Sequence, residues 1–572
     1  MASRAKVSLE DVRAVLYDEP SKATWDQLWR LLEKVPTEAL ALEYMPYVSG
    51  LLAMWPPGLR EAPAGLRAHL LGTGKEALKP VWEVIAPLVD HLVTPRNVAL
   101  DALKALGSNP KCRSLRHLTI GLPLHHQERE FEALAGAEHL VALESLSLSV
   151  DHISQSAADR LLAASWFRGL RHLTLHHAQW RGRSKQVDMP ELESLHLHMG
   201  EALPLLAGLG SGRHRLSALS LDVGHAVGSN PLRSLIDAPA AASIRSIRLA
   251  GYGGVELAQA ICEARGLTGL EVLSLGLRYD DLSAPLQALG RALFADRLKT
   301  LEIPRSNLTP AHIESLSRAP LPALESLDLS HNAMGDAGLL HLLDAPFLPT
   351  LRHLNLARTK LTDEAVGLLT GCEALAGLQT LDLSSNAIRL KGLSRLGQPH
   401  LLAALRTLRI GGNDATDKII QGLFASPALA GLERLDVQDS AQSVQGVFEL
   451  IASPEHTLTL RADALGALLD DLTHRERWEA MKDLALKTPA HARSKRGMVG
   501  HLRDILLVDK AALARLLCSR LMIGRLKVRV LKATLHRAGD RGYSKLSPDE
   551  LRARVEALLG VEGAPLLALI EG

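Results

Sequence analysis

The stretch LESLDLSHNAMGDAGLLHLL, residues 324–343, is followed by two close variants of itself. LRHLNLARTKLTDEAVGLL begins at residue 351 and LQTLDLSSNAIRLKGLSRL at residue 378, so the interval is 27 residues each time. The shared pattern is Leu-x-x-Leu-x-Leu, with Ile or Val replacing some leucines, and it recurs at intervals of 22–28 residues. Its starts are Leu115, Leu143, Leu170, Leu192, Leu216, Ile244, Leu270, Leu298, Leu324, Leu351, Leu378, Leu405 and Leu432. So regular a period indicates a repeat protein.

Each unit is expected to form a strand, a loop and a helix. The Leu-x-Leu alternation predicts a short strand with one buried face. The stretch that follows, such as DEAVGLLTGCEAL from Asp363, has helical spacing and an acidic start that suits a helix N-terminus. Burying about six Leu-type side chains in one unit contributes about 9–18 kcal/mol, whereas ordering about 27 residues costs on the order of 27–54 kcal/mol of backbone entropy. A single unit is therefore unstable, and stacking on neighbours must stabilise it.

These units resemble leucine-rich repeats of the ribonuclease-inhibitor-like subclass, through the phrase LDLSxNxI…GLxxL, clearest over residues 324–440. The resemblance implies an α/β solenoid over residues 113–462 with 13–14 repeats. It also implies a horseshoe with a parallel sheet on the concave face, helices on the convex face, and a protein-binding role. The units that begin at Leu170 and Leu192 are only 22 and 24 residues long and leave little room for a helix.

The two flanks do not repeat. Residues 1–112 contain amphipathic stretches, WDQLWRLLEKVPTEALALEYMPYV and LKPVWEVIAPLVDHLV, which predict a helical cap, or else a docking or effector domain. Residues 463–572 predict a basic helical domain, since residues 471–545 hold 18 Lys plus Arg against 7 Asp plus Glu. Ser547, Pro548 and Glu550 predict a capped helix start. The region is faintly similar to SAP-type DNA-binding modules; a solvated basic face or a face for an acidic partner is the other interpretation.

Composition and missing motifs argue against several functions. The net charge of +2 gives no global attraction to nucleic acid, and aromatic residues make up only 3%. No zinc-type CxxC pair and no hydrolase, P-loop or dinucleotide motif occurs. Cys518 begins CSR, not the Cys-x-Asp of bacterial leucine-rich-repeat ubiquitin ligases. We therefore expect no enzyme and no cofactor. The sequence has no apolar run long enough to predict a membrane span and no secretory leader. We therefore expect a cytoplasmic, monomeric protein of bacterial origin, although export without a leader would leave no mark in the sequence.

Polar residues that flank the buried leucines are predicted to form a mixed, mainly acidic stripe that contacts a partner. Counting from the first Leu of each unit, positions five and eight lie on or beside the concave face. The candidates there, with Trp180 added from a polar loop, are Glu302, Arg305, Asp328, His331, Asn355, Arg358, Asp382, Arg409, Asp436 and Trp180. Position nine carries three asparagines whose amides can satisfy the backbone of a tight turn: Asn332, Asn386 and Asn413.

A row of histidines falls in two consecutive units. His176 and His198 share position seven with Asp222 of the next unit, and parallel strands lie about 4.8 Å apart. Two imidazoles and a carboxylate at that spacing are a weak candidate for a zinc site. A polar surface without metal and a pH-sensitive contact patch are the other interpretations.

Taken together, these patterns predict a non-enzymatic scaffold that binds a protein partner, of unknown identity, on the concave face. A nucleic-acid-associated adaptor that uses the basic C-terminal helices is one alternative. A secreted effector that imitates host repeat proteins is another.

Overall fold

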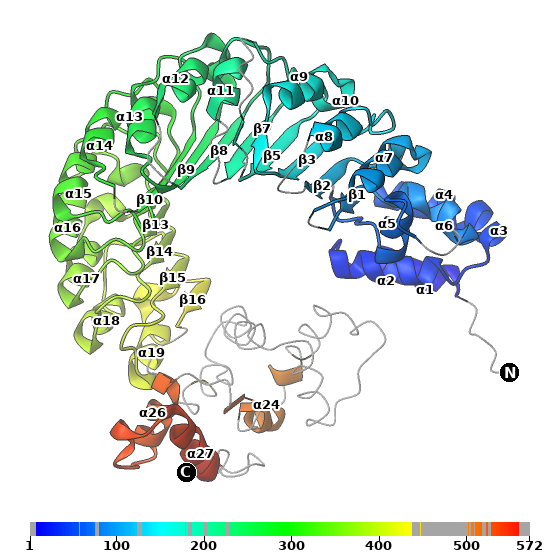
Figure 1. The fold of residues 1–572 in the computed structure, drawn as a ribbon. Coiled ribbons are helices and arrows are strands. Elements are labelled where there is room, and N and C mark those ends of the chain that lie inside the picture. Colours follow the sequence, from blue (N-terminus) through cyan, green and yellow to red (C-terminus); the bar gives the residue numbers. More distant parts are fainter. Residues whose placement is uncertain are drawn as a thin grey trace. The chain divides into compact units, whose positions relative to one another are not determined.

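The structure is a computed structural model (Figure 1). It describes residues 7–56, 58–74, 79–95, 97–122, 128–177, 179–180, 186–198, 203–224, 228–278, 280–437, 447, 502, 505–507, 510–517, 522–523 and 528–559. The chain divides into two compact units, Met1–Asp281 with Arg291–Phe294 and Leu282–Gly290 with Ala295–Gly572, called unit 1 and unit 2 below. Within the described residues, no helix has the length and apolar character needed to cross a bilayer.

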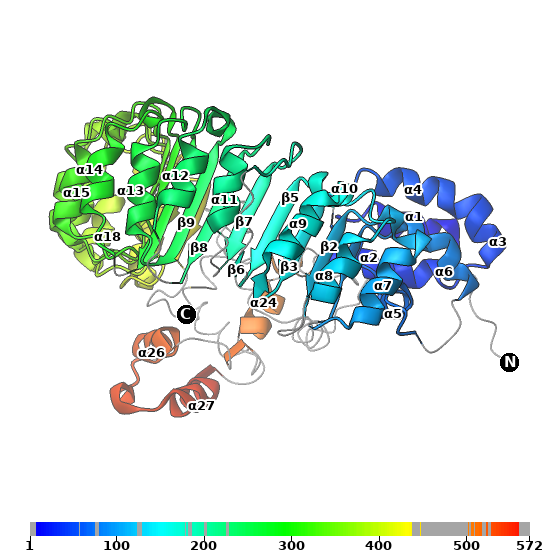
Figure 2. The same ribbon diagram turned by 45° about the horizontal axis from the view of Figure 1, so that its top comes forward.

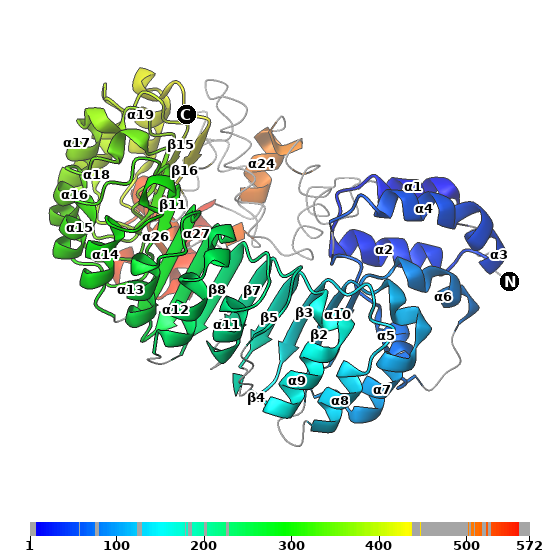
Figure 3. The ribbon, with the colours of Figure 1, turned by 90° about the horizontal axis from the view of Figure 1, so that it is seen from above.

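Unit 1 begins with a group of short helices, as its amphipathic stretches predict. The helices are α1 (Leu9–Leu16), α2 (Lys22–Leu32), α3 (Thr37–Ala39), η1 (Leu40–Tyr44), α4 (Met45–Leu52), α5 (Ala64–Leu70), α6 (Pro80–Ile85) and η2 (Ala86–Leu88). Figure 3 shows α1, α2 and α4 together. Apolar faces of these helices meet in a core that includes Trp25 and Leu28, both fully buried.

The first repeats of unit 1 pair in the order β1-β2-β3-β5-β7-β8-β9-β10, all in parallel. The strands are β1 (His91–Val93), β2 (His117–Gly121), β3 (Ser145–Ser149), β5 (His172–His176), β7 (Ser194–His198), β8 (Ala218–Val223), β9 (Ser246–Tyr252) and β10 (Val272–Arg278). The intervening helices are α7 (Leu100–Ser108), η3 (Pro110–Ser114), α8 (Glu128–Ala135), α9 (Gln155–Ala163), α10 (Ser165–Arg168), α11 (Leu203–Gly210), α12 (Asn230–Ile236), η4 (Pro239–Ser243) and α13 (Val255–Glu263). Figure 2 shows β8 and β9 side by side, with the helices along the other face of the sheet.

Unit 2 continues the same alternation with shorter strands, in the order β11-β12-β13-β14-β15-β16 and again parallel. The strands are β11 (Thr300–Glu302), β12 (Ser326–Asp328), β13 (His353–Asn355), β14 (Thr380–Asp382), β15 (Thr407–Arg409) and β16 (Arg434–Asp436). The helices are α14 (Ser283–Leu289), η5 (Ala295–Arg297), α15 (Pro310–Ser317), α16 (Gly335–Leu342), η6 (Leu348–Thr350), α17 (Asp363–Thr370), η7 (Glu373–Leu375), α18 (Leu390–Leu396), α19 (Asp417–Phe424) and η8 (Pro427–Leu429).

The leucines of the repeat form the core between sheet and helices. Leu324, Leu327 and Leu329 are at most 1% exposed, as are the equivalent leucines of the units that begin at Leu351 and Leu378. Because alternate residues of a strand face opposite ways, position five between them points to the other side of the sheet. The α/β solenoid of parallel strands and helices predicted from the repeat is confirmed.

The two short repeats behave differently from each other. Between β5 and β7, the described residues 186–193 contain no helix, which agrees with the expectation from the 22-residue interval. The 24-residue unit that follows nevertheless accommodates α11 between β7 and β8. A helix of eight residues is thus compatible with a 24-residue interval.

The stretch LKPVWEVIAPLVDHLV is not helical throughout, contrary to the prediction. Pro80 begins α6 instead of breaking a helix, as its missing N–H allows at a first helical position. His91–Val93 forms β1, because its backbone pairs in register with β2. The sheet therefore begins before residue 113. Glu61 makes a further bridge to His91, and buried Asp90 pairs with Arg60 at 2.8 Å, so the segment at residues 60–61 covers this edge of the sheet.

The C-terminal region is described mainly at residues 510–517 and 528–559. It forms α24 (Lys510–Leu517), α26 (Val528–Arg537), η10 (Tyr543–Lys545) and α27 (Pro548–Leu559). The capping box indicated by the sequence is present, since the Ser547 N–H donates to Glu550 Oε2 at 2.7 Å and the Glu550 N–H donates to Ser547 Oγ at 3.3 Å. Most of the predicted basic stretch lies outside the described residues.

Candidate functional site

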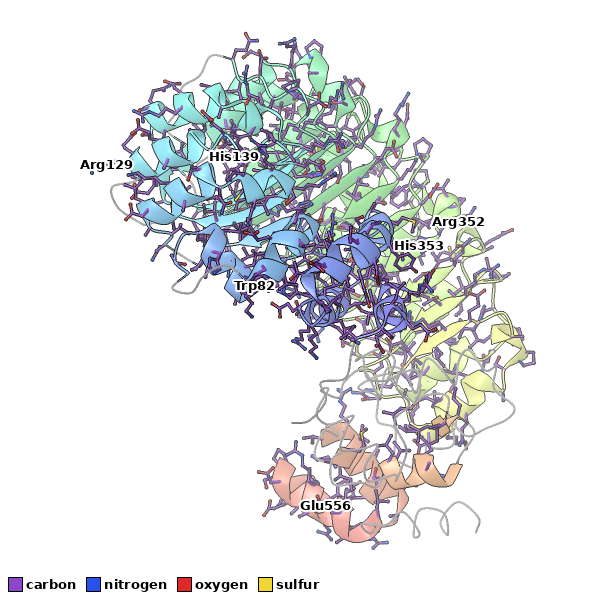
Figure 4. All side chains as sticks on the ribbon, turned by 90° about the vertical axis from the view of Figure 1, so that its right-hand side faces the viewer. Trp82, Arg129, His139, Arg352, His353 and Glu556 are labelled. Carbon is purple, nitrogen blue, oxygen red and sulfur yellow. The ribbon has the colours of Figure 1, made fainter. Side chains whose placement is uncertain are left out.

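The stripe at position five forms one continuous row across unit 2. Glu302 is the register partner of Asp328, and the pairing continues strand by strand to Asp436. All six side chains, Glu302, Asp328, Asn355, Asp382, Arg409 and Asp436, are half-buried. Figure 4 labels Arg352, which directly precedes β13, and His353, the first residue of that strand. The structure therefore brings these six sequence candidates together on one face.

Three members of the row also hold the backbone that follows their strands. Asp328 Oδ1 accepts from the Ser330 N–H at 2.8 Å, and Asp382 Oδ1 accepts from the Ser384 N–H at 2.9 Å. Asn355 makes the equivalent bond to the Ala357 N–H at 3.0 Å. This local Asx turn was missed in the sequence reasoning, although Asp or Asn two residues before a turn is its usual signal.

Neighbouring members of the row also satisfy one another. Asn355 Nδ2 donates to Asp328 Oδ2 at 2.8 Å, and Arg409 Nη1 lies 3.6 Å from Asp382 Oδ2. Both oxygens of Asp328 therefore have donors within the chain. The acidic character expected of this face is partly neutralised by its own neighbours.

The asparagines at position nine lie beneath the row and join neighbouring repeats. Asn332 is fully buried; its Oδ1 accepts from the N–H groups of Ser306 and Leu308 at 2.9 and 3.0 Å. Its Nδ2 donates to the carbonyls of Ile303 and Leu329 at 2.7 and 2.9 Å. Asn386 and Asn413 make the same kinds of bond two and three repeats later. Each amide thus satisfies buried backbone groups of two consecutive repeats.

Position eight, three residues beyond the row, has a left-handed backbone. Arg305, His331 and Arg358 have φ values of 55°, 59° and 57°, and all three side chains are exposed. Partial burial lowers the pKa of His331, the positive charges of the two arginines lower it further, and Asp328 opposes them. These three candidates therefore form a second line, parallel to the row and separate from it.

The histidine row of unit 1 forms as the register predicts. His176, His198 and Asp222 are consecutive partners on β5, β7 and β8, and His198 Nδ1 lies 2.7 Å from Asp222 Oδ2. His176 Nε2 lies 3.0 Å from Ser147 Oγ. Partial burial, followed by the charge of His198, lowers the pKa of both His176 and His196. No group of three or more His, Cys, Asp or Glu side chains within the described residues is arranged to hold a metal, and we make no zinc proposal here.

Trp180 belongs to a strand and not to a loop. β6 (Gln179–Trp180) pairs in parallel with β4 (His152–Ile153) in a small second sheet. Ile153 is the register partner of Trp180. The Trp180 side chain and the arginines after it lie outside the described residues, so the hot-spot prediction stays a prediction.

An alternation of charge at position two was not noticed in the sequence. Basic and acidic residues face each other there on consecutive repeats, and several pairs are in contact. Arg116 lies 3.1 Å from Glu144, Arg171 lies 3.5 Å from Glu193, and Arg245 lies 4.0 Å from Glu271, while Arg406 pairs with Glu433. Comparing equivalent positions of successive repeats would have shown it, because stacking makes those positions neighbours.

A pocket of about 540 Å³ lies in the helical part of unit 1, between α2, α5 and the start of α6. Trp29 and Trp82 form part of its wall, and Lys79 Nζ lies 4.7 Å from the centre of the Trp82 ring. Glu33 accepts from the Trp82 indole N–H, and Glu61 pairs with Lys22 and Arg67. The carboxylates of Glu33 and Glu61, which line the pocket, are therefore bound to other side chains of its wall. Figure 4 labels Trp82 on this segment.

The described C-terminal helices contact the last repeats of unit 2. Arg529 Nη1 donates to the Gly412 carbonyl at 2.7 Å, and Arg537 Nη1 lies 2.9 Å from Asp417 Oδ2. Arg554 pairs with Asp540 at 2.6 Å. These arginines hold the chain together, which is the behaviour of a cap.

The match to a family model agrees with the repeat architecture. Residues 322–343, 347–369 and 378–397 match the model of the family described as Leucine Rich repeat. The chain is similar in structure to an internalin from Listeria monocytogenes, at 18% identity and a TM-score of 0.37, over 65% of this chain and 94% of that one. It is also similar to Rad7 in a yeast Rad7–Elc1 complex, at 16% identity and a TM-score of 0.33, over 67% and 90%. No curated protein matches the sequence.

Proposed function

We propose that this leucine-rich repeat protein is a non-enzymatic scaffold that binds a protein partner on the sheet face of unit 2. The observation that carries the proposal is the register of β11–β16, which places polar and charged side chains of consecutive strands in one row while the leucines face the core. A rigid ladder of this kind presents many contacts at fixed spacing. A partner gains from such a surface because few side chains have to be ordered on binding.

A role in recognition, and not in catalysis, also fits the chemistry of the row. Asp328 and Asp382 accept hydrogen bonds from backbone N–H groups and from neighbouring side chains. Carboxylates held in this way are fixed in position, which suits a contact surface. The repeat fold itself is typically non-catalytic.

The remaining finer expectations stay proposals. The ribonuclease-inhibitor-like subclass is supported by the 26- to 27-residue intervals in unit 2 and by helices of eight residues such as α15, α16 and α17. Bacterial origin, a cytoplasmic location and a monomeric state are proposed on composition alone. We do not develop the nucleic-acid alternative, because the described arginines Arg529, Arg537 and Arg554 are engaged within the chain.

Blocking the face sterically tests the proposal whatever the charge of the partner. Thr380 and Thr407 are register partners on β14 and β15 and are half-buried on the sheet face. The double variant Thr380→Trp/Thr407→Trp should abolish capture of partners from an extract of the producing cell. Tryptophan suits strands, so the fold should persist.

The matched control places the same side chain on a helix. Leu340 on α16 is 52% exposed, and Leu340→Trp adds an indole away from the sheet. Capture should be unchanged in this variant. Equal capture by the double sheet variant, with an unchanged circular dichroism spectrum, would rule out the unit 2 face as the binding surface.

A further inference from the structure

Left-handed residues other than glycine are concentrated in three consecutive repeats of unit 2. Arg305, His331 and Arg358 occupy position eight, and Lys360, with a φ of 63°, follows two residues later. We call these four residues the basic arc. A left-handed backbone is unfavourable by about 1–2 kcal/mol for a residue with a side chain. Long basic residues are therefore present where the backbone alone favours glycine.

The backbone of the arc is fixed by bonds between repeats. The N–H of Arg305 donates to the Ser330 carbonyl at 3.1 Å, and the N–H of His331 donates to the Ala357 carbonyl at 2.8 Å. The N–H of Arg358 donates in the same way to the Ser384 carbonyl, at 2.9 Å. These bonds come from the main chain and need no particular side chain.

A later repeat shows directly that the fold accepts glycine at this position. Gly412 takes position eight with a φ of 74°, and Ser385 takes it in the repeat between with a φ of 56°. The arginine side chains are therefore not required to form the turn. Their presence therefore needs another explanation. Residues with a strained backbone often have a functional role.

The two arginines and the lysine of the arc have no ion-pair partner within the described residues. All four side chains are exposed. The arginines at position two differ, since Arg116 and Arg171 each face a glutamate of the next repeat. The nearest acidic row lies three residues back along the strand, and Asp328 there already accepts from Ser330 and Asn355.

We propose that the basic arc binds an acidic segment of the protein partner, a proposal that rests on the scaffold function above. Neighbouring strands lie about 4.8 Å apart, so Arg305 and Arg358, which are two strands apart, are separated by about 9.6 Å. This is close to the rise of about 10.5 Å between residues seven apart on a helix. A helix with carboxylates at that spacing can place one beside each arginine. Arginine pairs with carboxylates through two parallel hydrogen bonds.

The test uses the full chain and a fluorescein-labelled peptide of ten glutamates as the probe. The variant Arg305→Gly/Arg358→Gly/Lys360→Gly removes three charges and relieves three left-handed side chains. We expect peptide affinity to fall at least about tenfold at low salt, because exposed charges act mainly through long-range attraction. The melting temperature should stay the same or rise.

Two control variants separate the effect of the charges on peptide affinity from the effect of the left-handed backbone. Ser385→Gly relieves the same conformation without a change of charge and should leave peptide affinity unaltered. Arg305→Gln/Arg358→Gln keeps a polar side chain on the left-handed backbone but removes the charge, and it should weaken binding as the glycine variant does. Equal peptide affinity in the wild type and in both arginine variants would overturn the proposal.

The remaining outcomes are also decisive. A single-stranded DNA decamer that binds more tightly than the peptide, and depends on the same arginines, would replace the acidic segment with nucleic acid. Unchanged peptide binding in the arc variants, together with capture lost in Thr380→Trp/Thr407→Trp, would remove the arc and leave the scaffold function standing.

Discussion

The two units bury the same leucine pattern but build strands of different length. In unit 1, β2, β3, β5 and β7 have five residues each, and β9 and β10 have seven. In unit 2, β11–β16 have three each. The Leu-x-Leu core therefore does not set where a strand ends.

Position nine accounts for the difference in four of the unit 2 repeats. These carry Asn332, Thr359, Asn386 or Asn413 there, and each side chain donates to the carbonyl of the residue that follows its own strand. In β9 and β10 the same position is Tyr252 and Arg278, and these two residues are still register partners. A side chain that bonds to the backbone replaces ladder pairing, and where it is missing the strand continues.

Removing one of these amides should give the largest effect. Asn332→Ala leaves four buried backbone groups without a partner, each about 1–3 kcal/mol; because local relaxation recovers part of this, we expect a loss of about 4 kcal/mol. Hydrogen exchange should show the Ser306 and Leu308 amides opening first. Urea denaturation followed by circular dichroism measures the total.

The chain itself offers the control. Thr359 occupies position nine of one repeat, fully buried, with its hydroxyl donating to the Leu356 carbonyl at 2.6 Å. Asn332→Thr should therefore lose clearly less stability than Asn332→Ala. Equal losses would contradict the role assigned to the amide.

The row at position five should show a smaller, chemically selective effect. Asp382→Ala removes the acceptor for the Ser384 N–H and should cost about 1 kcal/mol. Asp382→Asn should stay within about 0.5 kcal/mol of the wild type, since a neutral amide oxygen accepts the same bond. Asn355 already does so in its own repeat. Thermal melts of the two variants in parallel distinguish the bond from the charge.

The histidine face of unit 1 should respond to pH. Burial lowers the folded-state pKa of His176 and His196 below the unfolded value of 6.5. The unfolded chain then binds more protons, so this stability is present above pH 6.5 and is lost as the pH falls through the folded-state pKa values. The effect per ring should be smaller than that of Asn332→Ala, because solvent screens these partly exposed groups.

Urea midpoints at pH 7.5 and 5.0 measure this dependence. The double variant His176→Gln/His196→Gln should lose less stability between the two pH values than the wild type. An identical loss in both proteins would show that these two rings are not responsible.

The position-two pairs should give the smallest effect, and the same one in both units. Glu144→Gln in unit 1 and Glu433→Gln in unit 2 each remove one partner of an exposed cross-repeat pair. We expect losses of about 0.5 kcal/mol or less. A double-mutant cycle with Arg116 or Arg406 isolates the pair; a coupling energy well above this value would show that the charges act as a network.

Much of the site could be predicted because residues at equivalent positions of successive repeats become neighbours in space when the repeats stack. Positions that recur every 27 residues, such as Asp328, Asn355 and Asp382, become register partners once the units stack. The prediction failed where local pattern and tertiary pairing disagree. The sequence around His91–Val93 has a helical pattern, yet these residues form a strand because their backbone pairs in parallel with β2.

The sequence by itself determined the repeat, the buried leucines and the alternation of strand and helix, because a short unit can bury its apolar face only against a copy of itself. Tertiary structure alone decided which charges remain available to a partner. Asp328 is satisfied by groups from two repeats, whereas Arg305 and Arg358 lie exposed on a strained backbone without an ion-pair partner among the described residues. Hydrogen-bond satisfaction depends on geometry between repeats, and spacing along one chain does not contain it.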